Sequence, residues 1–408
     1  MATGKATAEE TVCKEPGTGL IYILGAGALA LQWIIQRSLG VHLPNPWDIV
    51  FSGGCILGAA FLLTWASEAA EMDVPQNVAI GLLALVAVLP EYAVDMYFAW
   101  TAGKDPSYIS YAAANMTGGN RLIIGIAWPA ILLSVWWKRR ETSVQLTNSN
   151  SLEILALLAA TVYSFIIPLK GTLSLLDFFV LGGIFACYAV LSSKNSVEEP
   201  ELDGPALLIA CRPKLARRLL VVGLFALAAL AIYSAAEPFA EGLIQTGRRF
   251  GIEEFLLVQW LAPLASEAPE FIVAVVFALK GKPGVGMRAL ISSKINQWTL
   301  LVGMLPAVYC VSAGHMGAMH LDPRQIEEIF LTSAQSLLAM VMLLSLNFTA
   351  LSALLLFLMF ITQIFFPGTA VRYGFAAAYL AIAAGMLLAG KERRKSLRGM
   401  IGSVFVGK

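Results

Sequence analysis

Long apolar runs recur along the whole chain, separated by short polar stretches. A helix needs about 20 mostly apolar residues to cross the hydrocarbon core of a bilayer. By this measure the pattern predicts an all-α membrane protein with about twelve transmembrane helices, the tenth and eleventh joined by a tight connection at Asn347. The predicted spans are residues 18–39, 46–69, 77–101, 108–137, 151–168, 172–192, 217–246, 254–279, 286–313, 327–346, 349–366 and 369–390.

Composition supports the membrane class. The chain is 58% hydrophobic and 13% charged, whereas a soluble globular protein carries about 25% charged residues. The net charge of +1 gives no reason to expect a nucleic-acid partner. The sequence has no HExxH cluster, no serine elbow and no GxxxxGK[ST] loop, so we expect neither an enzyme nor an ATP-driven pump. The five cysteines are scattered, and we expect them to be free thiols.

The distribution of basic residues predicts the orientation, because loops rich in Lys and Arg stay in the cytoplasm. With the N-terminus inside, most of the 28 Lys and Arg residues lie in inner loops and in the basic C-terminal tail. This predicts a multi-pass protein of the plasma (inner) membrane with both termini cytoplasmic. Arg324 and Arg372 fall on the predicted outer side, and Arg121 and Lys294 fall inside apolar runs.

A polar stretch at residues 193–216 divides the chain near its middle and contains three prolines and several charges. It predicts a cytoplasmic linker between two halves. The predicted organisation is a segment with an additional helix at 1–45, halves at 46–192 and 217–366 on either side of the linker, and a helix with a basic tail at 367–408.

The two halves contain an internal repeat, at residues 89–125 and 268–303. Each copy begins with Pro-Glu and an aromatic residue, continues to Gly-Lys, and ends in Leu-aliphatic-aliphatic-Gly at the same distance from that Gly-Lys. The first copy starts on the third predicted helix and the second on the eighth. An odd number of crossings separates them, so the repeats are expected to have inverted topology, as in many secondary transporters.

The repeated Pro-Glu pair carries the chemistry. Glu91 and Glu270 fall inside predicted spans, where an ionisable side chain costs about 2.5–3.5 kcal/mol and therefore suggests function. Pro90 and Pro269 each remove a backbone donor and leave a carbonyl without its usual partner one turn earlier. Carboxylate and carbonyl oxygens together suit hard cations such as Ca²⁺ or Na⁺, and the carboxylates also suit H⁺.

Helical spacing adds further polar candidates. Asp95 lies one turn after Glu91, Glu267 lies one turn before Glu270, and both share a face with that partner. In the helix that follows each Pro-Glu helix, the repeat register aligns Asn115 with Ser293, and Gln297 lies one turn beyond Ser293 on the same face. Structural ion pairing with Lys294 or Arg121 remains an alternative role for the carboxylates, and Arg121 is expected to reach toward one membrane interface.

These segments resemble the repeats of the calcium/cation antiporter family, which includes the sodium/calcium and cation/proton exchangers. The resemblance rests on LASEAPEF (264–271) with ALISSKINQW (289–298), and on AVLPEY (87–92) with AAANMTGGN (112–120). It implies a sodium/calcium exchanger-like fold, whose ten helices correspond to the two halves. The helices at 18–39 and 369–390 are then one extra helix at each end.

Position by position, the resemblance implies that Glu91 and Glu270 are the paired acidic ligands of the transported metal ion. Ser266 stands at the family's hydroxyl position, and Ser293 stands at the serine of the second motif. With Glu267, Asn115, Gln297 and Asp95 these residues form the predicted ion-binding set, and Lys294 is the predicted charge partner.

The chain departs from the family pattern around both glutamates. Ala87 and Val88 replace the hydroxyl residues before Pro90, and Glu267 replaces the family serine before Pro269. Lys294 replaces an asparagine, and Gln297 stands where the family has an acidic or amide ligand. Fewer hydroxyls mean fewer sodium ligands, and the Lys294 ammonium is a possible substitute for a bound sodium ion.

The sequence thus predicts a secondary active antiporter that exchanges Ca²⁺ or a monovalent cation against Na⁺ or H⁺, by alternating access around midplane glutamates. A cation channel and a non-transporting homologue of the same fold remain alternatives. No cofactor is expected beyond the transported cations. The expected partners are the lipid bilayer and small inorganic cations, and the oligomeric state stays open.

Overall fold

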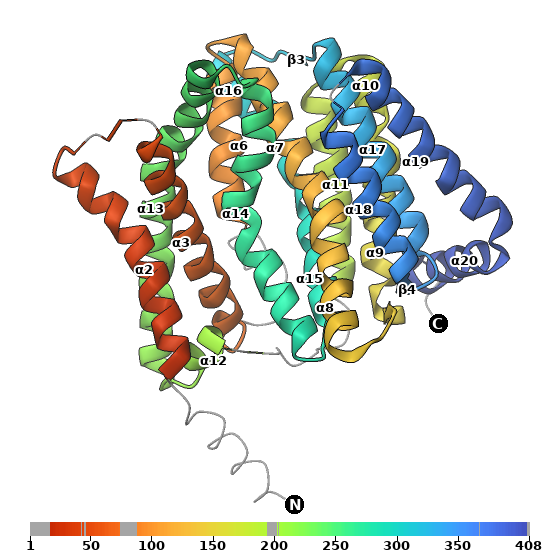
Figure 1. The fold of residues 1–408 in the computed structure, drawn as a ribbon, viewed down its shortest axis with the longest axis horizontal. Coiled ribbons are helices and arrows are strands. Elements are labelled where there is room, and N and C mark those ends of the chain that lie inside the picture. Colours follow the sequence, from red (N-terminus) through yellow and green to blue (C-terminus); the bar gives the residue numbers. More distant parts are fainter. Residues whose placement is uncertain are drawn as a thin grey trace, which may run out of the picture. The chain divides into compact units, whose positions relative to one another are not determined.

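The computed structural model describes residues 17–41, 43–44, 46–73, 88–193, 202, 204–366 and 368–405. These residues are almost entirely helical (Figure 1). Ten of the described helices are long and apolar enough to cross a membrane, and the apolar helix α18 is shorter. The predicted all-α membrane class is therefore confirmed. Of the span predicted at 77–101, residues 77–87 lie outside the described part of the chain.

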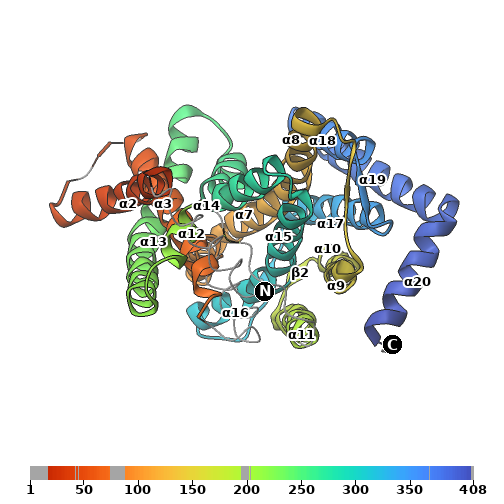
Figure 2. The ribbon, with the colours of Figure 1, turned by 90° about the horizontal axis from the view of Figure 1, so that it is seen from below.

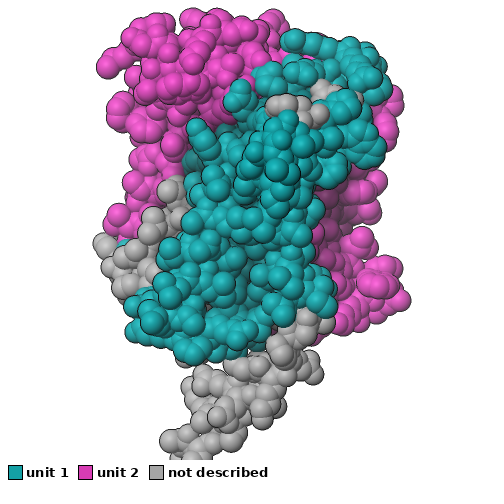
Figure 3. Space-filling model, turned by 90° about the vertical axis from the view of Figure 1, so that its left-hand side faces the viewer, with its two compact units in different colours: residues 1–94, 193–252, 265–269 teal, residues 95–192, 253–264, 270–408 magenta. Residues whose placement is uncertain are grey.

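The chain divides into two compact units, coloured separately in Figure 3. Unit 1 comprises residues 1–94, 193–252 and 265–269, and unit 2 comprises residues 95–192, 253–264 and 270–408. Each unit takes residues from both halves that the sequence predicts. The division passes through the two helices that carry the Pro-Glu pairs.

Unit 1 is built from long helices that pack through small residues. A side chain at Gly58 would lie 2.5 Å from the carbonyl oxygen of Ala26, so only glycine permits this close approach. The Trp33 indole donates a hydrogen bond to the carbonyl of Ser234. Figures 1 and 2 show α2, α3 and α13 side by side. The helices wholly within unit 1 are α2 (Gly17–Ser38), α3 (Trp47–Ala70), α12 (Gly204–Ala210) and α13 (Lys214–Phe250).

The stretch predicted as a polar linker contains a helix that the sequence analysis did not predict. Helix α12 contacts α2 and α3, and its residues Ala206 and Ile209 are buried. The expectation of free thiols needs a correction here. Cys55, Cys187 and Cys310 are free, but Cys211, directly after α12, is disulfide-bonded.

Asp73 lies outside the membrane-spanning segments, in the turn after α3, and forms an ion pair with the start of α13. Asp73 accepts a hydrogen bond from Nε of Arg217 at 2.6 Å and one from Nε of Arg218 at 3.2 Å. Arg217 also donates to the carbonyl of Ala210. The hydrogen bond from Arg217, together with the positive charge of both guanidinium groups, lowers the pKa of Asp73.

Asp73→Asn is expected to lower the thermal unfolding midpoint at neutral pH. A carboxylate whose pKa is lowered by folding stabilises the folded state above its unfolded pKa of about 3.9 and loses this effect as the pH falls through the lowered value. The midpoints of wild type and variant should therefore converge in acid. Arg218→Gln is the mild control, because the Arg218 side chain is 51% exposed. A difference that stays constant down to acid pH would contradict the assignment.

Unit 2 holds the remaining elements, together with parts of α6 (Leu89–Ala102) and α14 (Glu254–Leu279). The other helices are η2 (Pro106–Tyr108), α7 (Ile109–Leu122), η3 (Ile123–Ala127), α8 (Trp128–Arg139), η4 (Asn148–Asn150), α9 (Ser151–Ser164), α10 (Ile166–Lys170), α11 (Leu175–Ser192), α15 (Pro283–Asn296), η5 (Gln297–Leu301), α16 (Val302–Ala313), α17 (Pro323–Leu343), α18 (Ala350–Ile364), α19 (Thr369–Ala389) and α20 (Lys391–Phe405). The short strands are β1 (Ser143–Gln145), β2 (Thr172–Leu173), β3 (Met319–His320) and β4 (Asn347–Thr349).

Two small antiparallel pairings agree with the alternation of loops that the sequence predicts. Strand β1 pairs with β4, with Val144 opposite Phe348, and both strands lie in loops predicted on the inner side. Strand β2 pairs with β3, with Thr172 opposite His320; β3 lies in a predicted outer loop, and β2 directly follows one, at the start of the span predicted at 172–192. Loops expected on one side of the membrane thus contact each other within unit 2.

Some helix boundaries differ from the sequence prediction for identifiable reasons. Helix α17 begins at Pro323, four residues before the predicted start, because Asp322 and Gln325 form a capping box that satisfies backbone donors at this end. Helix α13 extends to Phe250 and keeps Pro238 inside it. The basic tail forms the helix α20, which the sequence reading missed.

Candidate functional site

The first Pro-Glu pair lies in the first turn of α6 as described. Glu91 is 4% exposed, and the backbone bond from Tyr92 to Val88 continues the helical turn past Pro90. One turn later, Asp95 is also buried and accepts a hydrogen bond from Asn115 of α7. The structure therefore brings together the predicted residues Asp95 and Asn115, while Ala87 lies outside the described residues.

The second Pro-Glu pair lies inside α14, whose bounds match the predicted span at both ends. Ser266 and Glu267 are buried. Glu270 is partly buried, its Oε2 atom is shielded from solvent, and it lies beside the hydroxyl of Ser293 on α15. Ser293 thus stands next to Glu270 as Asn115 stands next to Asp95, and in both cases the second helix of the repeat supplies the neutral polar partner.

Lys294 is fully buried and connects the second helices of the two repeats. Its ammonium group donates to the backbone oxygen of Asn120 at 3.1 Å and to the side-chain oxygen of Asn120 at 2.9 Å. The ammonium also lies 5.0 Å from the centre of the Trp298 ring, a distance suited to a cation–π contact. Lys294 therefore has neutral oxygen ligands on α7, a contact that the sequence did not predict.

Gln297 is the polar residue of this region with the clearest unmet hydrogen-bonding capacity. It is 2% exposed, and both its amide nitrogen and its amide oxygen lack a hydrogen-bond partner among the described residues. A buried amide without partners costs free energy, so such groups require a special explanation in a native protein. A bound ion or water would supply the missing interactions.

The second helices of the repeats are continuous, as predicted, but both contain the same irregularity, which the sequence does not predict. In each, an α-helix of 14 residues is followed by a π-helical segment of 5 residues and an α-helix of 12 residues. The segments are η3 after α7 and η5 after α15. Such π-helical insertions are rare and often lie at functional sites, and Gln297 is the first residue of η5.

Two glycines hold the second helices against α14. A Cβ atom at Gly118 of α7 would lie 1.7 Å from the carbonyl oxygen of Gln259. A Cβ atom at Gly286 of α15 would lie 2.4 Å from the carbonyl oxygen of Ala274. In both cases the obstacle is backbone, which cannot rotate away as a side chain can.

Gly118→Ala is therefore expected to destabilise the fold by about 2–3 kcal/mol, in the range of other overpacked cores. Gly183→Ala on α11 is the matched control, because no atom lies within 4 Å of its added Cβ and alanine is the better helix former. Thermal unfolding in detergent should show a lowered midpoint for the first variant alone. Equal midpoints for the two variants would mean that α7 can move away from α14 without cost.

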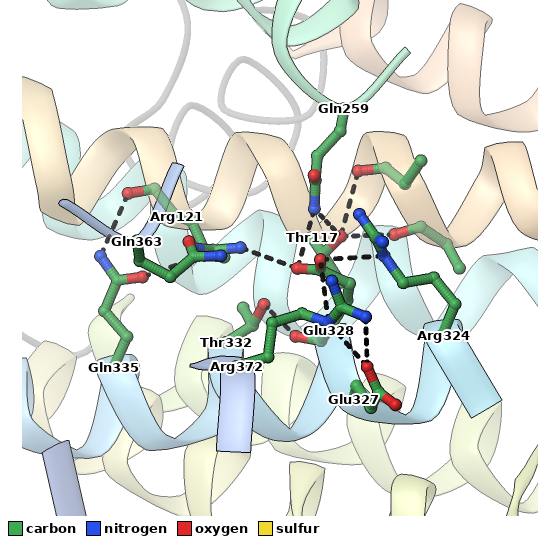
Figure 4. A network of polar contacts seen from close by, with 12 residues as sticks. Thr117, Arg121, Gln259, Arg324, Glu327, Glu328, Thr332, Gln335, Gln363 and Arg372 are labelled. Atoms are coloured by element: carbon green, nitrogen blue, oxygen red, sulfur yellow. Dashed lines mark hydrogen bonds and ion pairs between the residues drawn. The ribbon is translucent and has the colours of Figure 1, made fainter. Parts of the chain in front are cut away.

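Arg121 is the centre of a buried polar network in unit 2 (Figure 4). Its guanidinium group is 2.8 Å from Glu328 of α17 and also donates to the side-chain oxygens of Gln335 and Gln363. Its Cζ atom lies 5.3 Å from the centre of the Trp260 ring. The expectation that Arg121 reaches toward an interface is wrong, because the residue is fully buried within the helix bundle.

Glu328 makes one further hydrogen bond and two further ion pairs, with side chains of three helices. Gln259 of α14 donates to its Oε2 atom at 3.0 Å, and the same Gln259 amide contacts the hydroxyl of Thr117 at 3.3 Å. Arg324 lies 3.2 Å and Arg372 lies 3.9 Å from its Oε1 atom. Figure 4 shows Gln259, Arg324 and Arg372 gathered around Glu328.

Arg372 completes the network with Glu327. Its Nε atom donates to Glu327 Oε2 at 2.6 Å, and the side chain is 5% exposed. The sequence analysis counts Arg372 among the charges of the outer side but does not predict this buried ion pair with Glu327.

Sequence reasoning missed most of this network, although a signal existed: several members are amides inside otherwise apolar runs. The missed residues are Gln259, Glu327, Glu328, Gln335 and Gln363. Within the described ranges, no three side chains of His, Cys, Asp or Glu gather closely enough to hold a metal ion.

The chain is similar to ion exchangers of known structure. The sequence model of the family described as sodium/calcium exchanger protein matches residues 47–194 and 220–368. The structure titled "Crystal Structure of H+/Ca2+ Exchanger CAX" is 43% identical, with a TM-score of 0.92 over 96% of this chain and 98% of that one. The comparison with curated proteins gives no match.

Two more distant structures share the fold. The Ca²⁺/H⁺ antiporter protein YfkE is 14% identical, with a TM-score of 0.60 over 90% of this chain and 99% of that one. The sodium-calcium exchanger NCX_Mj is 18% identical, with a TM-score of 0.52 over 78% of this chain and 96% of that one. The family match covers both regions that contain a Pro-Glu helix. With the 43% identity to the exchanger CAX over nearly the whole of both chains, it shows that this chain belongs to the sodium/calcium exchanger protein family.

Proposed function

We propose that the protein is a secondary active antiporter that moves Ca²⁺ in exchange for H⁺. The chain is an integral, multi-pass membrane protein of an ion-exchanger family, so it is a transporter and not an enzyme. The observation that carries the choice of ions is the 43% identity, over 96% of the chain, to a structure titled as an H⁺/Ca²⁺ exchanger. The transported cations are its substrates, and the bilayer is its environment.

Glu91 and Glu270 bind the transported cation near the middle of the bilayer. This role is supported by the position of each glutamate beside a helix proline. Glu91 is buried, and the Oε2 atom of Glu270 is shielded from solvent. Asn115, Ser266, Ser293 and Gln297 add neutral oxygen ligands for the ion or its last waters. The unpartnered amide of Gln297 among the described residues supports this role.

Asp95 and Glu267 carry the protons. Two additional carboxylates allow the site to exchange one divalent cation for protons without leaving charge uncompensated in the membrane. The charge partner Lys294 holds a fixed positive charge near this region, bound to Asn120. Its ammonium takes the place that a sodium ion has in sodium-driven exchangers, which favours H⁺ as the counter-ion.

Transport proceeds by alternating access between two inverted repeats. The proposed arrangement has about twelve transmembrane helices, with the exchanger halves at 46–192 and 217–366 joined by the cytoplasmic segment 193–216. Residues 1–45 and 367–408 add one helix at each end, and both termini lie in the cytoplasm at the plasma membrane. The common succession of 14, 5 and 12 residues in the second helices supports the repeat.

The test is ion flux into sealed vesicles that contain the purified protein. A proton gradient of either direction should drive Ca²⁺ across the membrane against the flow of protons. A Na⁺ or K⁺ gradient should not drive Ca²⁺ movement. Flux that runs down its gradient without coupling to H⁺ would identify a channel. Absence of flux for every cation, from protein shown to be folded, would identify a non-transporting homologue.

A further inference from the structure

The last helix, α20, carries an excess of positive charge that the rest of the protein does not neutralise. Its sequence, KERRKSLRGMIGSVF, has five basic residues and one acidic residue. Lys391, Arg393, Lys395 and Arg398 make no ion pair within the described part of the chain. The Nε atom of Arg393 is shielded from solvent and has no acceptor among the described residues.

The charges and the apolar residues of α20 occupy different faces. Lys391, Lys395 and Arg398 are spaced i, i+4 and i+7, so they share one face, and all three are exposed. Leu397, Met400, Ile401 and Val404 have the spacing of a second face. Met400 is buried, whereas the side chain of Ile401 is 45% exposed. Such a helix, basic on one side and apolar on the other, is typical of segments that lie in a membrane interface.

Helix α20 lies directly beside the end of a candidate membrane span. Only Gly390 separates it from α19, which is a candidate membrane span ending at Ala389. Arg394 donates to the carbonyls of Leu387 and Leu388 and so fixes the corner between the two helices. Figure 1 shows α20 running across the direction of α19, at the end of unit 2 where α8 ends and β4 lies. Figure 2 shows the same helix from below, and α20 contacts α9 as well as α19.

We propose that α20 is a surface helix that binds the headgroups of anionic lipids through Lys391, Lys395 and Arg398. Charge complementarity selects this occupant, because the three unneutralised side chains face away from the protein beside the end of a membrane span. The apolar residues on the other face enter the acyl boundary or pack on α9. Basic clusters directly next to a membrane span are attracted to anionic leaflets by about 1 kcal/mol per residue.

The test measures hydrogen exchange of the α20 amides in the complete protein, reconstituted into vesicles. One set of vesicles is pure phosphatidylcholine, and the other contains about one third phosphatidylglycerol. We expect the α20 amides to exchange at least about fivefold more slowly in the anionic vesicles, because this is the effect of the attraction of one basic residue to anionic lipid. The protection should disappear at high salt, which screens surface charges. Inorganic phosphate added to phosphatidylcholine vesicles should give no protection.

The variant Lys391→Gln/Lys395→Gln/Arg398→Gln should abolish the difference between the two vesicle types. Lys138→Gln, an exposed charge at the end of α8, is the control and should keep the difference. Equal exchange of wild-type α20 in both vesicle types would overturn the proposal, because the helix would then be held by α9 and α19 alone. Because this comparison uses wild-type protein, it does not depend on the folding of any variant, nor on transport.

Discussion

Glu270→Gln is expected to abolish exchange of Ca²⁺ for H⁺ while leaving the protein folded. Glutamine keeps the size and the hydrogen bonds of the side chain, but it carries no negative charge and cannot release a proton at neutral pH. A Ca²⁺ ion in the low-dielectric interior depends on full negative charges to replace its water ligands. The measurement is the initial rate of Ca²⁺ uptake driven by a pH gradient in vesicles, together with the thermal midpoint of the same preparation.

The matched control is Glu253→Gln, immediately before the first residue of the same helix α14. Its side chain is 47% exposed and lies 3.7 Å from Arg324, an exposed pairing that contributes little. This variant should transport at the wild-type rate. Glu91→Gln should behave as Glu270→Gln does. If Glu270→Gln retains the wild-type rate, the assignment of this carboxylate as an ion ligand is wrong, although the antiport itself can still be measured separately.

Glu328→Gln is expected to lower the free energy of unfolding by about 3–5 kcal/mol, the usual loss when one partner of a buried ion pair is removed. The change leaves the Arg121 guanidinium fully buried with neutral amide partners, Gln335, Gln363 and the introduced glutamine, in place of its carboxylate. The change also removes the negative partner of Arg324, whose Nε atom is 3.2 Å from the carboxylate. The measurement is the midpoint of thermal unfolding in detergent.

The double variant Arg121→Met/Glu328→Gln separates the loss of the pair from a general perturbation of the site. Replacing both members of a buried ion pair is often nearly neutral, because no charge remains uncompensated. The double variant should therefore melt above the Glu328→Gln single variant. If the double variant is instead the less stable of the two, Arg121 stabilises the bundle by packing, against Trp260 and Phe360, and not by its charge.

The sequence predicts the parts of this protein that depend on local composition. Residues 254–279 were predicted as a span and form α14 with the same bounds, because a long apolar run between polar ends has one simple solution in a bilayer. Asp95 and Asn115 are both singled out by their spacing from repeat landmarks, but the hydrogen bond between them is known only from the structure. The family resemblance, which rests on short motifs around the two prolines, is likewise confirmed by the family match.

What the sequence does not predict depends on contacts between distant segments. The partner of Arg121 lies 207 residues away, and no local pattern identifies it. The start of α17 at Pro323 depends on a side-chain cap in the preceding loop. The π-helical segments η3 and η5 leave no periodicity that distinguishes them from the flanking α-helices. Helix α20 begins with five consecutive charged residues. Its apolar face is therefore too short to stand out as a hydrophobic run in the sequence.

The separation between Arg121 and Glu328 has a consequence for how the protein is made. Helix α7 leaves the ribosome before α17 exists, and 207 residues must be added before the carboxylate follows the guanidinium. At ordinary rates of synthesis this takes about 10–40 s. During that time a helix with an arginine inside it faces an insertion cost of about 2.5–3.5 kcal/mol without compensation. Until the second half of the chain is inserted and completes the bundle, we therefore expect α7 to stay beside the translocon or the Arg121 side chain to extend toward water.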